Sequence, residues 1–416
     1  MNKSLSLTKK LSIMEGMLSC GIAVLNAGFV FTALALYFKS TPFIIAFLSA
    51  IPIITQGAQV FTLKIYRIFK TRKKAFIIIA IMSRGIYLLI PLMIVLDFKS
   101  PYILVFILIL HNLFGTILGN IWTATMQFVI KSDERAEYFS KRNLYISVAT
   151  MIYFYLYGYA LNKFDPKTGL FIVTLLMSIS SIISVVLLNK HFVPCLDFKT
   201  TDKMSFFAPL RDNDFLKFLV FAIFWILGNE LTKPFFSYYQ VQILNVNKQY
   251  LGSLNVISGI ISTILYLFLG KMTKKIGNER LLFVGIMIST VNFLLYIFIN
   301  SSNFKYILSI EAVINGFANS IVGLTFFNML LSIIKTPVEA YSGLFSMISG
   351  FFGLIAALMG GAIGNATQNK SFIIFDYSFS EIKIIFLFGF IIRIITLIIL
   401  AYVEKNQTVL TKELSL

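Results

Sequence analysis

Twelve long apolar segments divide this sequence, and each is long enough to cross a lipid bilayer. A hydrocarbon core of about 30 Å needs about 20 consecutive apolar residues in a helix. A backbone in lipid must satisfy its own hydrogen bonds, so such segments form helices. The sequence therefore predicts an all-α membrane protein with spans at residues 12–38, 42–64, 75–96, 101–130, 144–161, 169–189, 214–236, 249–270, 281–300, 305–333, 340–365 and 381–403.

Composition and charge agree with this class of protein. The chain is 58% hydrophobic and 13% charged, which excludes a water-soluble domain. The net charge of +18 lies in short loops between spans, so we attribute it to membrane topology rather than to nucleic-acid binding. Of the 36 Lys and Arg residues, 24 fall on one side and seven on the other. This predicts a protein of the cytoplasmic (inner) membrane with both termini in the cytoplasm.

The spacing of the spans predicts two six-helix bundles. The longest gap follows the sixth span, which predicts a bundle at 1–190, a cytoplasmic linker at 191–212, a second bundle at 213–404 and a cytoplasmic tail at 405–416. No loop is long enough for a soluble catalytic domain. The sequence also lacks a phosphate-binding glycine-lysine loop, a metal cluster and a nucleophile-base pair. We therefore expect no enzyme activity, no cofactor and no resident metal.

The two halves carry matching features. Asn26 and Asn229 are 203 residues apart, and so are Asn112 and Asn315. These pairs fall in the first and seventh spans and in the fourth and tenth. Basic segments at 64–74 and 270–280 repeat at nearly the same offset. The sequence therefore indicates a duplicated membrane protein.

The second of these basic segments resembles the cytoplasmic loop signature of the major facilitator superfamily of secondary transporters. Gly270, Gly277 and Arg280 match its glycines and basic cluster, whereas Lys274 replaces the usual acidic residue. The resemblance implies two pseudo-symmetric bundles that alternate access to a central cavity lined by helices one, four, seven and ten. It also implies a gating role for those three matching residues.

The chain also resembles, more narrowly, one bacterial branch of that superfamily to which no substrate is assigned. It is carried by Glu15-Gly16, Trp122, the segment 135–143 and Pro234-Phe-Phe236. On this likeness, we expect a cytoplasmic gate that is locked by pairing across the halves through Arg135, Tyr138 and Arg142.

Two polar stripes lie in helices that the resemblance places at the cavity. We define the fourth-helix stripe as Asn112, Thr116 and Asn120, and the tenth-helix stripe as Glu311, Asn315 and Asn319. Each is spaced i, i+4, i+8 and therefore occupies one helix face. We predict that these stripes face each other across the cavity. Their amides and Thr116, together with Asn26 and Asn229, are the predicted substrate-binding residues. The competing interpretation is hydrogen bonding between packed helices.

Three titratable residues are candidates for proton coupling. An intramembrane carboxylate can carry a proton because burial penalises its charged form. Glu311 is the first choice because it belongs to a stripe, and Glu230 is the second. The alternative for these carboxylates is an interfacial pair with Lys233 or Lys305. His111 is a possible relay or a packing residue.

Three further charged residues lie in or near spans. Arg84 and Arg393 are mid-span in helices three and twelve, which the resemblance places at the periphery, so we expect them to turn inward or snorkel. Anion binding is the alternative role. For Glu15 we favour a simple stabilising interaction with the N-terminus of the first helix.

These features predict a monomeric secondary active transporter that moves a small polar organic solute by alternating access. Coupling to protons and contact with membrane lipids are expected. Amide-rich stripes favour a neutral or zwitterionic solute. The alternatives are an exporter of amphipathic, drug-like compounds and a transporter-like receptor or lipid-handling protein without solute cycling.

Overall fold

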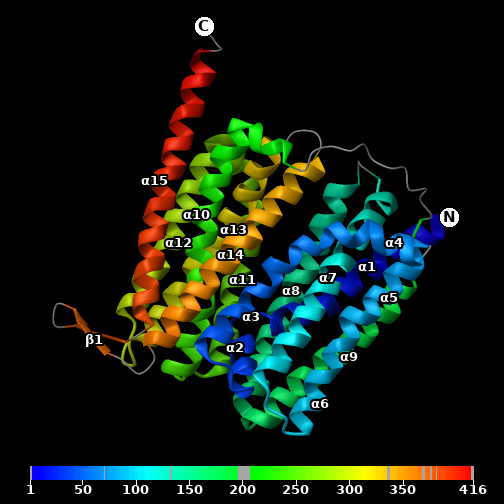
Figure 1. The fold of residues 1–416 in the computed structure, drawn as a ribbon, viewed down its shortest axis with the longest axis horizontal. Coiled ribbons are helices and arrows are strands. Elements are labelled where there is room, and N and C mark those ends of the chain that lie inside the picture. Colours follow the sequence, from blue (N-terminus) through cyan, green and yellow to red (C-terminus); the bar gives the residue numbers. More distant parts are fainter. Residues whose placement is uncertain are drawn as a thin grey trace. The chain divides into compact units, whose positions relative to one another are not determined.

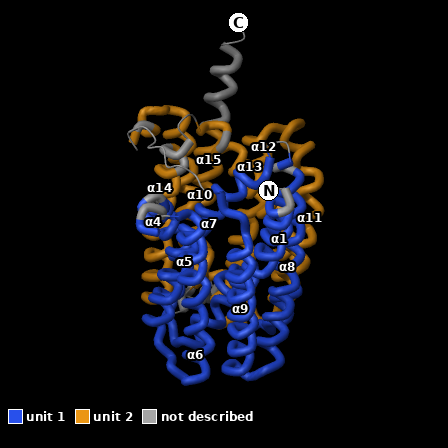
Figure 2. Tube along the Cα trace, turned by 90° about the vertical axis from the view of Figure 1, so that its right-hand side faces the viewer, with its two compact units in different colours: residues 1–202, 245–253 blue, residues 203–244, 254–416 orange. Residues whose placement is uncertain are grey.

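A computed structural model describes residues 2–69, 71–131, 134–194, 207–334, 338–367, 371–374, 377–380 and 382–413. Most of the predicted linker, including Cys195, lies outside these residues. The chain divides into two compact units, coloured separately in Figure 2. Unit 1 comprises Met1–Asp202 and Asn245–Ser253, and unit 2 comprises Lys203–Leu244 and Leu254–Leu416. Each is described below by itself.

All the regular secondary structure among the described residues of unit 1 is helical (Figure 1). Its elements are α1 (Asn2–Leu25), α2 (Gly28–Tyr37), α3 (Pro42–Ile54), the 3-10 helix η1 (Thr55–Phe61), α4 (Thr62–Phe69), α5 (Arg72–Gly85), the 3-10 helix η2 (Ile86–Leu88), α6 (Leu89–Val95), α7 (Pro101–Val129), α8 (Arg135–Lys163) and α9 (Pro166–Asn189).

Unit 2 adds a short hairpin to its helices. Its elements are the 3-10 helix η3 (Ala208–Arg211), α10 (Asn213–Tyr238), the π-helix η4 (Tyr239–Ile243), α11 (Lys248–Ile276, whose first residues belong to unit 1), α12 (Asn278–Phe298), α13 (Phe304–Ile333), α14 (Val338–Thr367), β1 (Ser371–Ile374), β2 (Tyr377–Ser380) and α15 (Lys383–Glu413). The strands pair antiparallel, with Ser371 opposite Ser380. The predicted tail is helical as far as Glu413.

Short side-chain caps explain why several spans in unit 1 begin where they do. Thr41, Ser100 and Asp165 each accept a hydrogen bond from the backbone N–H three residues later. Each is followed by proline at the first helical position. The cap satisfies a free N–H group and the fixed proline φ favours the first turn. These sequence signals set three helix starts: α3 and α7 begin at the predicted span boundaries, and α9 begins at Pro166, three residues before the predicted one.

The first predicted span is bent rather than continuous. Helices α1 and α2 meet at an angle of 54° at Asn26 and Ala27. Gly28 adopts a φ of +56°, a left-handed conformation that favours glycine. Among the described residues, 11 helices are long and apolar enough to cross a membrane, and 12 if this bent pair counts as one span. This agrees with the predicted all-helical class and number of spans.

The basic loop predicted between residues 270 and 280 is almost entirely helical. Helix α11 continues to Ile276 and α12 begins at Asn278. Gly277, with a φ of +91°, forms the break between them. Gly270 and Arg280 therefore lie within helices rather than in a loop, and the left-handed conformation at the break is one that glycine adopts readily.

Helix packing within unit 2 depends on close backbone approach. Helix α10 packs against α14 and α15, and α12 packs against α13 and α15. Buried Phe218, Phe221 and Leu282 belong to the apolar core between these helices. At Gly360 of α14, a Cβ atom would clash with the backbone carbonyl oxygen of Leu231 in α10. Glycine therefore allows the two backbones to touch.

Replacing Gly360 by alanine is expected to lower the melting temperature and the yield of folded protein, because backbone cannot yield as a flexible side chain can. Gly85→Ala is the matched control, since nothing lies within 4 Å of a Cβ placed there. That control should leave the melting temperature unchanged or slightly raised. Equal melting temperatures for both variants in detergent would show that α10 and α14 do not need this close contact.

Candidate functional site

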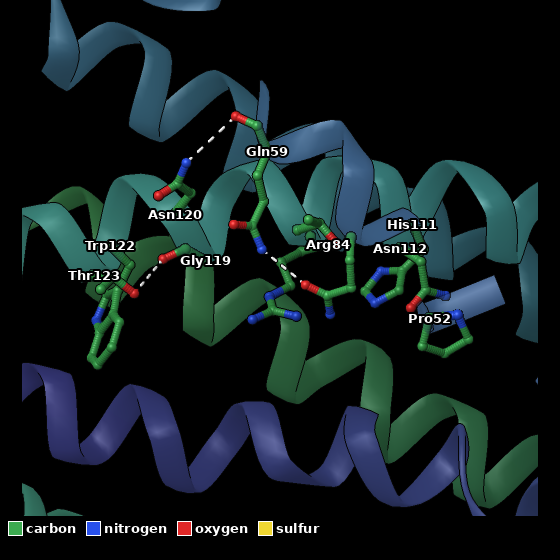
Figure 3. A pocket seen from close by; sticks show the side chains of 12 residues that line it. Pro52, Gln59, Arg84, His111, Asn112, Gly119, Asn120, Trp122 and Thr123 are labelled. Carbon is green, nitrogen blue, oxygen red and sulfur yellow. Dashed lines mark hydrogen bonds between the residues drawn. The ribbon is translucent and has the colours of Figure 1, made fainter. Parts of the chain in front are cut away.

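The fourth-helix stripe lines a cavity of about 500 Å³ in unit 1 (Figure 3). Asn120, Trp122 and Thr123 lie toward one end in this view, and His111, Asn112 and Pro52 lie toward the other. The lining residues are Pro52, Gln56, Gln59, Arg84, His111, Asn112, Gly115, Thr116, Gly119, Asn120, Trp122 and Thr123. Most come from α7, because residues spaced by three or four share a helix face.

The amides of this stripe are partly satisfied within unit 1. Asn112 Nδ2 donates to the backbone oxygen of Leu108 one turn earlier, at 2.8 Å. Asn120 Nδ2 donates to Thr62 Oγ1 at 3.1 Å. Asn112 therefore makes a bond within its own helix, whereas Asn120 bonds to another element. The interhelical interpretation fits Asn120 better than Asn112.

His111 is held by α5 rather than free in the cavity. Its Nδ1 lies 2.8 Å from the backbone oxygen of Ser83, and the Ser83 hydroxyl donates to the His111 carbonyl at 3.3 Å. Its ring lies 4.1 Å from the Tyr87 ring, centroid to centroid. His111 thus has a packing role and also lines the cavity.

Arg84 lines the same cavity and forms a buried ion pair. Its Nη2 lies 3.3 Å from Glu15 Oε1, which also accepts a 2.8 Å hydrogen bond from Ser184 Oγ. Glu15 is only 4% exposed and lies near the middle of α1, because this helix begins at Asn2. The expected role of Glu15 at the helix N-terminus is therefore wrong. Arg84 turns inward from its helix, which is one of the two orientations expected for a mid-span arginine.

Unit 2 contains a second polar cavity, of about 430 Å³. It is lined by Trp225, Asn229, Glu230, Thr232, Lys233, Phe236, Ser289, Asn292, Phe293, Asn315, Ala318, Asn319, Val322, Gly323 and Arg393. Asn315 and Asn319 of the tenth-helix stripe lie together here, and Asn229 and Glu230 of α10 join them. The cavity therefore combines amides with aromatic rings and charged groups.

A chain of hydrogen bonds links this cavity to Glu311. Asn292 Nδ2 donates to Asn315 Oδ1 at 2.7 Å, and Asn315 Nδ2 donates to Glu311 Oε1 at 2.6 Å. The Tyr296 hydroxyl is a further partner of Glu311 and itself accepts a hydrogen bond from Gln240. Glu311 is 9% exposed. Its hydrogen-bond partners among the described residues are thus neutral.

Arg393 enters the unit 2 cavity from α15. Its Nη2 donates to Asn229 Oδ1, and its guanidinium carbon lies 3.5 Å from the centroid of the Trp225 ring. It is 2% exposed. Arg393 therefore turns inward from its helix, which is one of the two orientations expected for a mid-span arginine.

Glu230 forms an ion pair as well as lining the cavity. Its Oε1 lies 3.4 Å from Lys233 Nζ, three residues along α10. This is the pair that the interfacial interpretation expected. The hydrogen-bond partners of Glu311 among the described residues are therefore neutral, whereas Glu230 has a cationic neighbour.

Asn26 is not among the residues that line the unit 1 cavity. It lies at the bend between α1 and α2 and donates its side-chain amide to the Tyr87 hydroxyl. Although Asn26 and Asn229 match in sequence, α10 continues straight through Asn229 while α1 ends before Asn26. The two asparagines consequently have different surroundings.

Two of the predicted gating residues contact α1 within unit 1. The Tyr138 hydroxyl donates to the Lys9 backbone oxygen at 3.0 Å, and Arg142 Nε donates to the Ser12 backbone oxygen at 3.4 Å. The Arg142 guanidinium also stacks on Trp122 at 4.4 Å. The side chain of Arg135 lies outside the described residues, and pairing across the halves stays a prediction.

Several lining residues were missed by the sequence reasoning. Asn292, in the middle of the ninth span, carries the same signal as the selected asparagines and could have been found. Gln56 and Gln59 lie near the end of the second span and could also have been selected as intramembrane amides. Trp225 could not, because an aromatic residue in a span is most often a packing residue.

Comparison with known proteins identifies the family. A model of the Major Facilitator Superfamily matches residues 11–357, which is most of the chain. A comparison with curated protein sequences gave no match.

Solved structures give the same fold at low sequence identity. The nucleoside transporter NupG has a TM-score of 0.70 and 13% identity, covering 97% of this chain and 100% of that one. An auto-inhibited peptide transporter of the POT family has a TM-score of 0.74 and 12% identity, covering 97% of each chain. A bacterial homologue of the iron transporter ferroportin in an inward-facing state has a TM-score of 0.63 and 12% identity, covering 96% and 97%. The chain therefore belongs to the major facilitator superfamily and is a multi-pass secondary transporter rather than an enzyme.

Proposed function

We propose that this transporter moves a small polar organic solute across the cytoplasmic membrane and couples its movement to protons. The observation that carries the proposal is the hydrogen-bonded series Asn292–Asn315–Glu311, which joins a cavity-lining amide to a buried carboxylate. Both cavities present amide groups that can donate and accept hydrogen bonds. These amide groups can form hydrogen bonds with a polar solute. The aromatic rings that line the unit 2 cavity favour an organic solute.

Glu311 is the proposed proton carrier. An ionised carboxylate only accepts hydrogen bonds, whereas a protonated carboxyl also donates one. Proton binding at Glu311 would therefore change the hydrogen bonds available to Asn315, and through Asn315 those of Asn292. Because Asn315 and Asn292 both line the cavity, protonation and solute binding would share the same amides.

Proton binding also relieves the cost of a buried charge. The neutral partners of Glu311 compensate its negative charge only partly, so its ionised form is penalised by burial. Glu230, by contrast, already has Lys233 as a cationic partner at 3.4 Å. This contrast supports Glu311 over Glu230 as the titrating group.

Replacing Glu311 by glutamine is expected to abolish proton-driven accumulation while solute exchange between the two sides continues. Glutamine keeps a hydrogen-bonding side chain of similar shape but cannot bind and release the proton. The measurement uses proteoliposomes with an imposed pH gradient. A gradient of about one pH unit can sustain about tenfold accumulation at one proton per solute. The variant should reach only the external concentration.

Asp214→Asn is the matched control, since Asp214 is an exposed carboxylate in the first turn of α10 and should retain full accumulation. Retained accumulation by Glu311→Gln, or its selective loss in Glu230→Gln, would show that Glu311 does not carry the proton.

A further inference from the structure

Arg393 lines the unit 2 cavity, and its guanidinium has donors that no described residue uses. Asn229 accepts one of its hydrogen bonds, and Trp225 covers one face of the group. The Phe293 ring lies 5.6 Å from the guanidinium carbon. Its Nε and Nη1 atoms are buried and have no hydrogen-bond partner among the described residues. A fixed positive charge with two free N–H-bearing nitrogens therefore lines a cavity.

Protein groups within the described residues do not neutralise this charge. The partners of Arg393 are a neutral amide oxygen and aromatic rings, and the ion pairs of the described residues do not include it. Glu230 also lines the cavity; its Oε1 is paired with Lys233 and its Oε2 is buried without a hydrogen-bond partner, and neither oxygen forms an ion pair with Arg393 among the described residues. Glu311, beside the cavity, accepts from Asn315. A buried charge without a counter-ion is costly, so a ligand with a negative group would relieve that cost.

The other arginine in a span, Arg84, has its buried charge compensated by the protein itself. Arg84 also lines a cavity, but Glu15 provides a carboxylate for it at 3.3 Å. Arg393 also lines a cavity, but among the described residues no carboxylate lies at that distance from it. The missing counter-charge is thus specific to the unit 2 cavity.

We propose that Arg393 binds a carboxylate group of the transported solute, which makes the solute an organic anion or a zwitterion. This rests on the proposed transport function and names the substrate class for the same cavity. The planar guanidinium presents N–H groups that match the two oxygens of a carboxylate. Asn319 and Asn292 can then bind polar groups elsewhere on the solute, and Trp225 and Phe236 can contact its apolar part.

A single unpaired arginine suits a monoanion better than a phosphate. A phosphate group carries more charge and more acceptor oxygens. Among the described residues, the other cation that lines the cavity is Lys233, which already pairs with Glu230. Inorganic phosphate is therefore the discriminating probe for the alternative oxyanion.

The test is titration calorimetry on the purified full-length protein with matched acid and amide probes. Nicotinate and nicotinamide form one pair, and lactate and lactamide form another, with inorganic phosphate added as a third kind of probe. At least one acid is expected to bind at least tenfold more tightly than its amide. Equal affinities within both pairs, absence of binding by both acids, or tighter binding of phosphate would each overturn the carboxylate site.

Arg393→Met is the decisive variant. It should abolish the preference for the acid and leave the melting temperature of the ligand-free protein unchanged or raised, because an uncompensated buried charge is removed. Should Arg393→Met fail to fold, Arg393→Lys keeps the charge without the planar donors and should bind the acid at least tenfold more weakly. An unchanged preference for the acid in either folded variant would overturn the proposal.

Flux measurements separate this proposal from the transport proposal. If acid binding depends on Arg393 but no acid crosses proteoliposome membranes, the anion site stands and solute transport by this cavity fails. If acids are transported equally by wild type and Arg393→Met, transport stands and the anion site fails.

Discussion

Replacing Asn315 by leucine is expected to reduce the initial rate of solute uptake by about 10- to 100-fold. Asn315 joins Asn292 to Glu311 and also lines the unit 2 cavity. Leucine has a similar size but removes the donor that Glu311 accepts from. A hydrogen bond to a charged group contributes about 1.5–3 kcal/mol, which corresponds to about 10- to 100-fold in an equilibrium constant. The measurement is uptake into proteoliposomes, normalised to folded protein.

Asn112→Leu tests the corresponding position in unit 1. Its amide nitrogen bonds only within α7, to Leu108, among the described contacts. The variant should therefore retain folded yield and lose uptake. Asn162→Leu is the control, since Asn162 is exposed near the end of α8. Normal uptake by both Asn315→Leu and Asn112→Leu would mean that the asparagines only connect helices.

Replacing Arg84 by methionine is expected to destabilise the protein by about 3–5 kcal/mol, the usual cost of removing one partner from a buried ion pair. Glu15 would keep only the Ser184 hydrogen bond as compensation for its buried charge among the described contacts. The free energy of unfolding in detergent, or the melting temperature, measures the loss. The expected change is opposite to that of Arg393→Met, although both remove an intramembrane arginine.

The double variant Arg84→Met/Glu15→Leu isolates the cause. Removing both charges should restore most of the lost stability, because no uncompensated ion remains. A double variant as unstable as Arg84→Met would contradict the ion-pair explanation and would indicate that Arg84 stabilises the unit through packing alone.

Much of the fold follows from local patterns in the sequence. The apolar segments predicted an all-helical membrane protein, and the glycines at 270 and 277 pointed to the superfamily that the family match then established. The caps at Thr41, Ser100 and Asp165 are local signals, so the helix starts after them were predictable. Helical spacing also predicted which residues of each stripe share a face.

Features that depend on distant parts of the chain were not predictable. The partner of Arg84 lies 69 residues away in α1, and Ser184 lies 169 residues from Glu15. The stacking of Arg393 on Trp225 joins α15 to α10. The bend at Asn26 also contradicts the apolar pattern, which continues across it. Such contacts depend on tertiary packing, which periodicity does not encode.

We infer that the asparagine-lined cavities bind the transported solute. The most direct measurement is a thermal-stability screen of the purified protein against a library of polar metabolites, with Asn112→Leu/Asn315→Leu screened in parallel. A ligand that binds only the folded state raises the melting temperature, by an amount that grows with its concentration relative to Kd. We expect at least one metabolite to stabilise the wild type but not the variant. A metabolite that stabilises both proteins equally would place its binding site away from these asparagines and would contradict the claim.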